Sequence, residues 1–178
     1  MKTNYILLFT ISIIFFLSCN PEVNNNVCPP NTDPFGTDPY GAIRSHSDCK
    51  EMSGKINSQV LNSDECIYYQ YFAEYKILYI SHINAAFNCE PGKISSKISF
   101  KDNNIFIEEH QEKSDARCNC LYDISYELRN IRSDIYFLSI SGPIIDGVTH
   151  PSLGVYIDLT QKAEDTYCTT RGFYPWSE

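Results

Sequence analysis

One histidine and three cysteines are the residues of this sequence with the clearest capacity for chemistry. His82 and Cys89 lie close together in the chain, and Cys118 and Cys120 follow further along. Imidazole and thiolate are ligands that zinc prefers, so the four residues could form a tetrahedral Cys₃His site. The Cys-x-Cys spacing is, however, tighter than that of most structural zinc sites, and thiolates outside the cytoplasm oxidise readily. Disulfides are therefore the preferred interpretation, with no cofactor implied, and a zinc-binding or thiol-redox domain is the alternative.

The cysteine count bears on the same choice. The chain has 8 Cys, of which Cys19 is assigned to a lipid anchor below. The remaining disulfide candidates are Cys28, Cys49, Cys66, Cys89, Cys118, Cys120 and Cys168. An odd set leaves one thiol over after three bridges. Cys118 and Cys120 point to the same face of one expected strand, so they should have different partners, and Cys89 is the natural partner for one of them. In the zinc alternative, Cys28, Cys49, Cys66 and Cys168 would instead form two bridges.

Two further groups of residues have the residue types of a metal site or a catalytic site but not the spacing or context that such sites require. Glu108–Glu112 contains several carboxylates and a histidine, but it follows a hairpin strand and is predicted to be a solvated polar loop. His46 lies beside Ser45, Ser47 and Asp48, which are the residue types of a hydrolase triad. Triads are recognised by geometry and not by adjacency, so no catalytic residue is predicted.

The elements that must position these residues have the alternation of β-strands. Leu78, Ile80 and His82 fall on one face of a long expected strand, and Cys118–Leu128 alternates in the same way. Ile94–Phe100 and Ile105–Glu108 flank Lys-Asp-Asn-Asn, which predicts a hairpin because Asp and Asn tolerate tight turns.

Strands recur along the chain without convincing amphipathic helices. Six or seven are expected after Cys66, and residues 50–62 could hold either a short helix or a first strand. Tyr, Ile and Phe favour pleated, half-buried surfaces. The fold class predicted is all-β: an antiparallel β-sandwich, immunoglobulin-like or related, stapled by disulfides.

The first residues read as a secretory leader. Lys2 provides the positive start, and Tyr5–Leu17 is an uncharged apolar run too short for a comfortable transmembrane helix. The run ends in Ser18-Cys19, which resembles the lipobox of bacterial lipoproteins. The resemblance implies a signal peptide over 1–18 and a palmitate-type lipid anchor on Cys19. An ordinary leader, with Cys19 as a disulfide partner, is the alternative.

Residues 19–48 are predicted to be the lipidated cysteine and a tether, leaving 49–178 as a single β-sandwich domain. The tether contains Thr-Asp-Pro-Phe-Gly and Thr-Asp-Pro-Tyr-Gly, each of which reads as a turn. A calcium loop using Asp33 and Asp38 is the functional alternative, but two carboxylates are too few oxygen ligands.

Charge and the C-terminal aromatic residues bear on partners. The formal net charge is -8 without a basic cluster, so a nucleic acid partner is not expected. Membrane contact must come from the N-terminal lipid, and Asn20 after Cys19 favours the outer membrane in family terms. Phe173, Tyr174 and Trp176 could contact a protein or glycan partner, or could pack on the sandwich.

A wider resemblance concerns the body of the chain. His-x-Asn-x-x-Phe-Asn-Cys (82–89), Cys-x-Cys-x-Tyr-Asp (118–123) and Tyr-Pro-Trp (174–176) resemble uncharacterised secreted bacterial lipoproteins. Glu90 stands where a second cysteine is common in that group, which weakens a multi-cysteine metal cluster. The resemblance implies a lipid-anchored β-domain and supplies no activity.

The sequence therefore predicts a lipid-anchored protein of the cell envelope that binds or scaffolds without catalysis. The alternative is the metal-binding or redox domain of His82 and Cys89, Cys118 and Cys120, and a glycan hydrolase is a third, less favoured class.

Overall fold

Nine β-strands make up the regular structure of the described residues. The computed structural model describes residues 37–50, 64–113, 118–145, 147, 149 and 151–172, all within the unit Thr37–Glu178. The strands are β1 (Tyr40–His46), β2 (Asp64–Phe72), β3 (Ile77–Asn88), β4 (Ile94–Lys101), β5 (Asn104–Gln111), β6 (Asn119–Arg129), β7 (Ile135–Ser141), β8 (Leu153–Asp158) and β9 (Glu164–Thr170). Among these residues, no helix is long and apolar enough to cross a bilayer.

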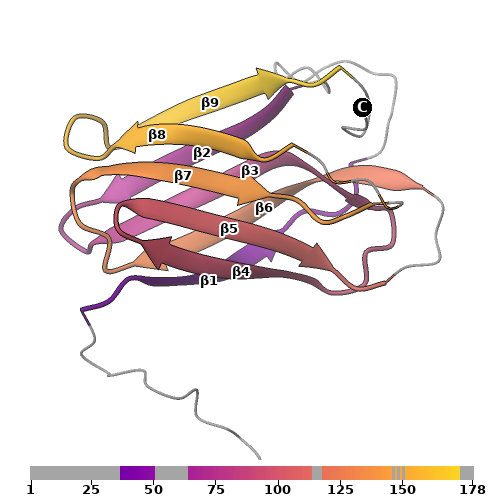
Figure 1. Cartoon of the computed structure of the whole chain (residues 1–178), viewed down its shortest axis with the longest axis horizontal. Helices are drawn as coiled ribbons and strands as arrows, with labels where there is room; N and C mark the ends of the chain where they lie inside the picture. Colours follow the sequence, from indigo (N-terminus) through magenta and orange to yellow (C-terminus); the bar gives the residue numbers. More distant parts are fainter. Residues whose placement is uncertain are drawn as a thin grey trace, which may run out of the picture. The chain divides into compact units, whose positions relative to one another are not determined.

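The strands form two sheets that pack face to face (Figure 1). Sheet A has five strands in the order β1-β6-β3-β2-β9, and sheet B has four in the order β4-β5-β7-β8. The prediction of an all-β, disulfide-stapled sandwich is confirmed. One pair departs from the antiparallel expectation, since β5 and β7 are parallel. The chain leaves sheet B after β5, runs through β6 in sheet A and returns as β7, so two reversals restore the original direction.

Alternation of residues along each strand builds the core. In β2, Ile67, Tyr69 and Tyr71 face inward and are buried, while Tyr68 and Gln70 remain partly exposed. The predicted inward faces of β3 and β6 are confirmed in the same way. The largest fully buried side chains include Tyr69, Tyr126, Phe87, Ile80, Ile105, Ile107, Ile124 and Leu128. Burial of each such side chain stabilises the fold by roughly 1.5–3 kcal/mol before the entropy of ordering is counted.

The predicted hairpin is confirmed. Strands β4 and β5 pair in continuous register, ending at Lys101 opposite Asn104. Asp102 in the connecting turn has φ 52°, a conformation that Asp tolerates better than most residues.

One boundary differs from the sequence prediction. Residues 40–46 were expected within the tether but form β1, which pairs with β6 at the edge of sheet A. Only Gly41 and Ile43 of this strand are partly buried, so its apolar alternation is too weak to recognise. Seven described strands, β3 to β9, begin after Cys66, in agreement with the six or seven expected. Of residues 50–62, only Lys50 is described, and it forms an isolated bridge to Leu121. The prediction of a helix or strand there lies outside the described residues.

Candidate functional site

His82 lies at the centre of a buried polar network between the two sheets. It projects from β3 into the interior and is only 2% exposed. Its Nε2 donates to Oε1 of Glu65 on β2 at 2.8 Å, and its Nδ1 donates to Oε1 of Glu109 on β5 at 2.8 Å. Glu109 is 1% exposed and belongs to sheet B, so the second contact joins the two layers.

Two more side chains extend the network in opposite directions. Tyr126 on β6 donates its hydroxyl to Oε1 of Glu109 at 2.6 Å. Arg171, just after β9, donates from Nε to Oε2 of Glu65 at 2.6 Å and also donates to the carbonyl oxygen of Pro151 at 3.0 Å. The resulting series of contacts runs from the segment before β8, through both carboxylates and His82, to β6.

The electrostatics of the network keep His82 positively charged at neutral pH. Burial by itself would lower the pKa of His82, but the charges and hydrogen bonds of Glu109 and Glu65 outweigh it and raise the pKa to about 10. Burial would raise the pKa of Glu65, but His82 and then Arg171 lower it below its usual value. Burial, together with the charge of Glu109, raises the pKa of the Tyr126 hydroxyl. Two cations and two carboxylates are thereby balanced inside the protein.

This arrangement gives His82 a structural role. Both ring nitrogens hold carboxylates, so the ring cannot accept a proton from a substrate while these contacts persist. His82 is therefore a buried histidine whose two ring nitrogens both have hydrogen-bond partners. Oε2 of Glu109 is buried and has no hydrogen-bond partner among the described residues, which is a cost that the rest of the network must offset.

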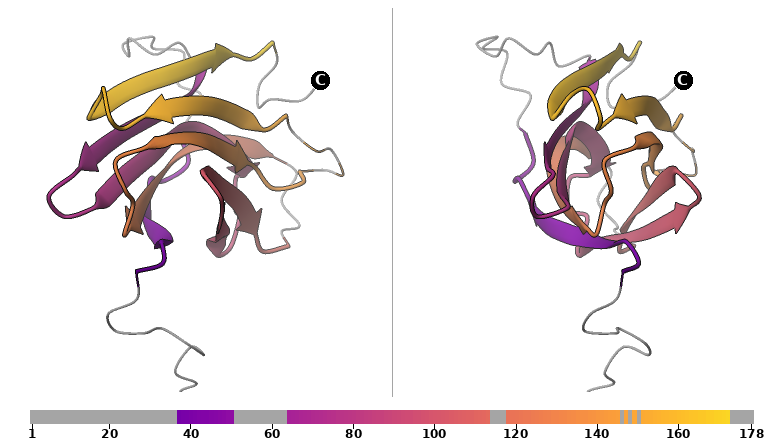
Figure 2. Two further views of the ribbon diagram at one scale, coloured as in Figure 1. Left: turned by 60° about the vertical axis from the view of Figure 1, so that its left-hand side comes forward. Right: turned by 90° about the vertical axis from the view of Figure 1, so that its left-hand side faces the viewer.

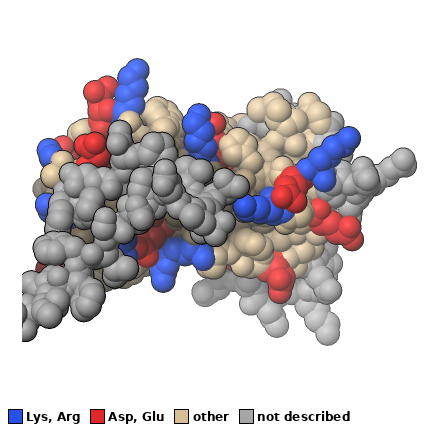
Figure 3. Space-filling view, turned by 90° about the horizontal axis from the view of Figure 1, so that it is seen from below, with Lys and Arg blue, Asp and Glu red and all other residues tan. Residues whose placement is uncertain are grey.

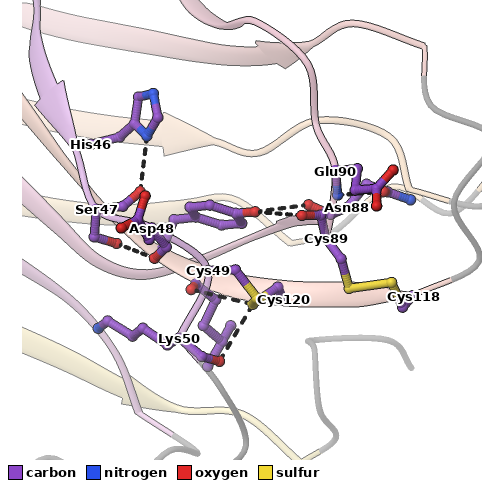
Figure 4. The surroundings of a disulfide bond; sticks show 12 residues. His46, Ser47, Asp48, Cys49, Lys50, Asn88, Cys89, Glu90, Cys118 and Cys120 are labelled. Carbon is purple, nitrogen blue, oxygen red and sulfur yellow. Dashed lines mark hydrogen bonds between the residues drawn. A yellow bond between two sulfur atoms is a disulfide. The ribbon is translucent and has the colours of Figure 1, made fainter.

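The six described cysteines form three disulfides. The pairs are Cys49–Cys120, Cys66–Cys168 and Cys89–Cys118, each with Cα atoms no more than 5.6 Å apart. Figure 4 shows Cys89 bonded to Cys118, with Cys49 beside Cys120. The predictions that Cys118 and Cys120 have different partners, and that Cys89 bonds to one of them, are confirmed.

The zinc alternative is wrong for these residues. The sulfur atoms of Cys89, Cys118 and Cys120 are consumed in disulfides, and His82 is bonded to two carboxylates. No group of His, Cys, Asp and Glu suited to a metal ion occurs among the described residues. Alternation along the strands could not distinguish zinc from disulfides, because it shows on which face of a strand a cysteine lies and not which residue it contacts.

A second polar cluster surrounds a β-bulge in β3. The register between β3 and β6 shifts after His82, and Asn84 takes φ 62° there. The backbone N–H of Asn84 donates to Asp123, and its side chain accepts from Nζ of Lys50 at 2.7 Å. Lys50 also donates to Asp123 at 2.5 Å, so these side chains fix the segment after β1 to the bulge.

The Ser, His and Asp residues near position 46 do not form a hydrolase triad. His46 contacts the backbone carbonyl of Ser47, and the Ser47 hydroxyl donates to the carbonyl oxygen of Asp48. The same hydroxyl accepts from the backbone N–H of Asp123, which explains its position. These residues therefore join the end of β1 to β6.

The prediction for Glu108–Glu112 is partly wrong. Strand β5 extends to Gln111, so Glu109 faces the core instead of solvent. Glu108 and His110 do face outward, Glu108 in an ion pair with Lys97. Glu109 has the same parity as Ile105 and Ile107, and this alternation is the signal for its inward position; charge runs usually face solvent, which favours the opposite interpretation.

Several predicted residues lie outside the described residues. These are Cys19, Cys28, Asp33, Phe173, Tyr174 and Trp176. Asp38 is described and exposed, and its backbone carbonyl accepts from Asn130. The sequence also missed Glu65, Tyr126 and Arg171 as members of the network around His82.

The outer faces of both sheets carry aromatic side chains. On sheet B, Tyr156 is 71% exposed and its ring lies 5.0 Å from that of Phe137. On sheet A, the guanidinium of Arg44 lies over the ring of Tyr79, which also contacts Phe72. On the face shown in Figure 3, basic and acidic side chains are interspersed, so this face offers no extended basic surface of the kind that phosphate binding requires.

No family model, curated protein or solved structure matches the chain. The functional argument therefore depends on the residues and geometry described above.

Proposed function

We propose that this protein is a lipid-anchored domain of the cell envelope that binds a protein or glycan partner without catalysis. The three intramolecular disulfides carry the proposal, because such bonds form and persist in oxidising compartments outside the cytosol. An exported chain with an apolar leader and a cysteine directly after it fits an acylated anchor.

The anchor would hold the domain through hydrocarbon burial. Each buried CH₂ contributes about 0.8 kcal/mol, and one acyl chain alone binds only reversibly, so stable anchoring takes more than one chain. The acidic chain would gain nothing from anionic lipid. Asn20 favours placement in the outer membrane.

A binding role is supported by what the polar and aromatic residues do. The histidine, carboxylates and cysteines that suggested chemistry are engaged in contacts that hold the fold. Aromatic rings and an arginine remain on the outer faces, and these residue types are enriched where proteins bind tightly.

The test labels cells with a palmitate analogue and compares two cysteine variants. Cys19→Ala should abolish labelling and leave unprocessed precursor, whereas Cys28→Ala, a matched control nearby in the chain, should label normally. Chemical crosslinking in intact cells should then capture a specific partner of the anchored protein. Normal labelling and maturation of Cys19→Ala would remove the anchor, and the absence of any crosslinked partner would remove the binding role.

A further inference from the structure

No described strand of sheet B lies opposite β9. Sheet A contains one more described strand than sheet B, and β8, the last strand of sheet B, lies against β2. The inward residues of β2 are buried, but the corresponding residues Tyr167 and Thr169 of β9 are only partly buried. Within the part of the chain that the structure describes, the place of a fifth strand in sheet B is therefore open.

A cleft occupies this place. Its volume is about 330 Å³, and it lies between Leu153, Gly154 and Val155 of β8 and Tyr167 and Thr169 of β9. Although β8 and β9 are consecutive, their Cα atoms lie more than 8 Å apart over nearly their whole length. Paired strands lie about 5 Å apart, so β8 and β9 do not form a hairpin ladder. Figure 2 shows β9 at the top of both views, and β8 and β9 each lie at the edge of their own sheet.

The edge of β8 has the chemistry to accept another strand. It pairs with β7 in unbroken register on one side, and no described strand pairs with it on the other. Alternate backbone N–H and C=O groups therefore point into the cleft. Natural edges are usually guarded by lysine, proline or a bulge, but Leu153–Asp158 contains none of these.

We propose that an extended peptide segment of a partner protein adds to the free edge of β8 as the fifth strand of sheet B. Backbone hydrogen bonds supply affinity, and every second side chain of the peptide covers Tyr167 and Thr169. An extended polypeptide is the ligand that satisfies a row of alternating backbone donors and acceptors. This inference rests on the proposed binding function and assigns it a surface and a partner class.

Charge indicates the direction of the added strand. The chain around the β8–β9 connection carries Asp158, Glu164 and Asp165 against Lys162. Asp165 has the parity of the cleft residue Tyr167 and is paired with Lys162 at 2.7 Å, whereas Asp158 and Glu164 have the parity of the outward residues Tyr156 and Thr166. An antiparallel strand places its N-terminal end there, so basic residues are expected in the first half of the peptide. At the other end, Arg171 is occupied by Glu65 and the Pro151 carbonyl and so fixes the wall of the cleft.

The experiment selects ten-residue peptides from a displayed library on the purified full chain. In the selected sequences, small apolar residues should occupy every second position, and Lys or Arg should occur in the first half. A synthetic copy should slow hydrogen exchange in β8 and leave β4, the other edge of sheet B, unchanged. N-methylation of alternate peptide amides should weaken binding at least tenfold.

Two substitutions on one strand separate the cleft from the rest of the surface. Thr169→Arg fills the cleft and should weaken binding at least tenfold, while Thr166→Arg, on the exposed opposite face of β9, should change it less than twofold. If Thr169→Arg does not fold, the N-methylated peptide and the exchange pattern decide.

Four results would overturn the inference: no selected binder, protection at β1 or β4 instead of β8, equal effects of the two arginine variants, or protection of β8 that rises with protein concentration alone. The last would assign the edge to a second copy of the chain. A partner crosslinked in cells that is insensitive to Thr169→Arg would leave the proposed binding function in place and remove only this surface.

Discussion

The charge balance around His82 makes a specific prediction about paired substitutions. His82→Leu leaves Glu65 and Glu109 facing the single cation Arg171, and Glu109→Leu leaves His82 and Arg171 facing the single carboxylate Glu65. The double variant leaves Arg171 and Glu65 as a balanced pair. It should therefore be at least as stable as either single variant.

The expected size follows from the burial of the groups. Removing one partner of a buried ion pair costs about 3–5 kcal/mol, because an uncompensated charge remains inside. Additive effects would give the double variant a cost of about 6–10 kcal/mol. Replacement of both partners by apolar residues can be close to neutral, so a coupling free energy of at least about 3 kcal/mol is expected.

Urea unfolding followed by circular dichroism, with the disulfides intact, measures the four free energies of unfolding. The cycle is run in a Tyr126→Phe background, because the Tyr126 hydroxyl would otherwise lose its acceptor and add a cost of its own. Additivity of the two single effects within about 0.5 kcal/mol would refute the charge-balance argument.

Three further predictions concern other parts of the molecule. The pKa of His82 is raised from 6.5 in the unfolded chain to about 10 in the folded state. Its stabilising contribution is therefore complete below pH 6.5 and is lost as the pH rises toward 10. The urea midpoint of the wild type should fall over this range, and that of His82→Leu should not. Removal of the Cys66–Cys168 pair by double Ala substitution should lower the free energy of unfolding by about 1 kcal/mol more than removal of Cys89–Cys118, because the closed loops span 102 and 29 residues. Equal losses of unfolding free energy in the two variants would contradict the loop-entropy argument. Asn84→Ala should be less stable than Asn84→Gly by about 1 kcal/mol, the reverse of the usual order in a strand, because φ is 62° there; the usual order in urea unfolding would show that the strain is absent.

The sequence was sufficient for the sandwich because alternation is a local property. Ile80 and His82 share a face of β3 whatever that strand pairs with, and the same holds for Tyr122 and Tyr126 in β6. Asp102 marks the hairpin for an equally local reason, its tolerance of positive φ. Features that depend on one strand and its turns could therefore be predicted.

The network around His82 depends on sheet order and on packing between layers. Parity alone places Glu65, His82 and Glu109 on inward faces, since each alternates with buried apolar residues. That Glu109 reaches His82 from the other sheet requires β5 to lie across from β3, which no local pattern specifies. Disulfides were the preferred interpretation of the cysteines, but their complete pairing could not be predicted for the same reason, because partner identity is a property of the assembled sheets.

The two kinds of crosslink hold different parts of the sandwich. The three described disulfides join β2 to β9, the segment after β1 to β6, and the segment after β3 to the segment before β6, so none of them reaches sheet B. Sheet B is held to sheet A by apolar packing and by the contact of His82 with Glu109. Arg171 belongs to this network and also fixes one wall of the cleft beside β8. Weakening the network should therefore disturb sheet B and its free edge first, while the covalently joined sheet A keeps its order.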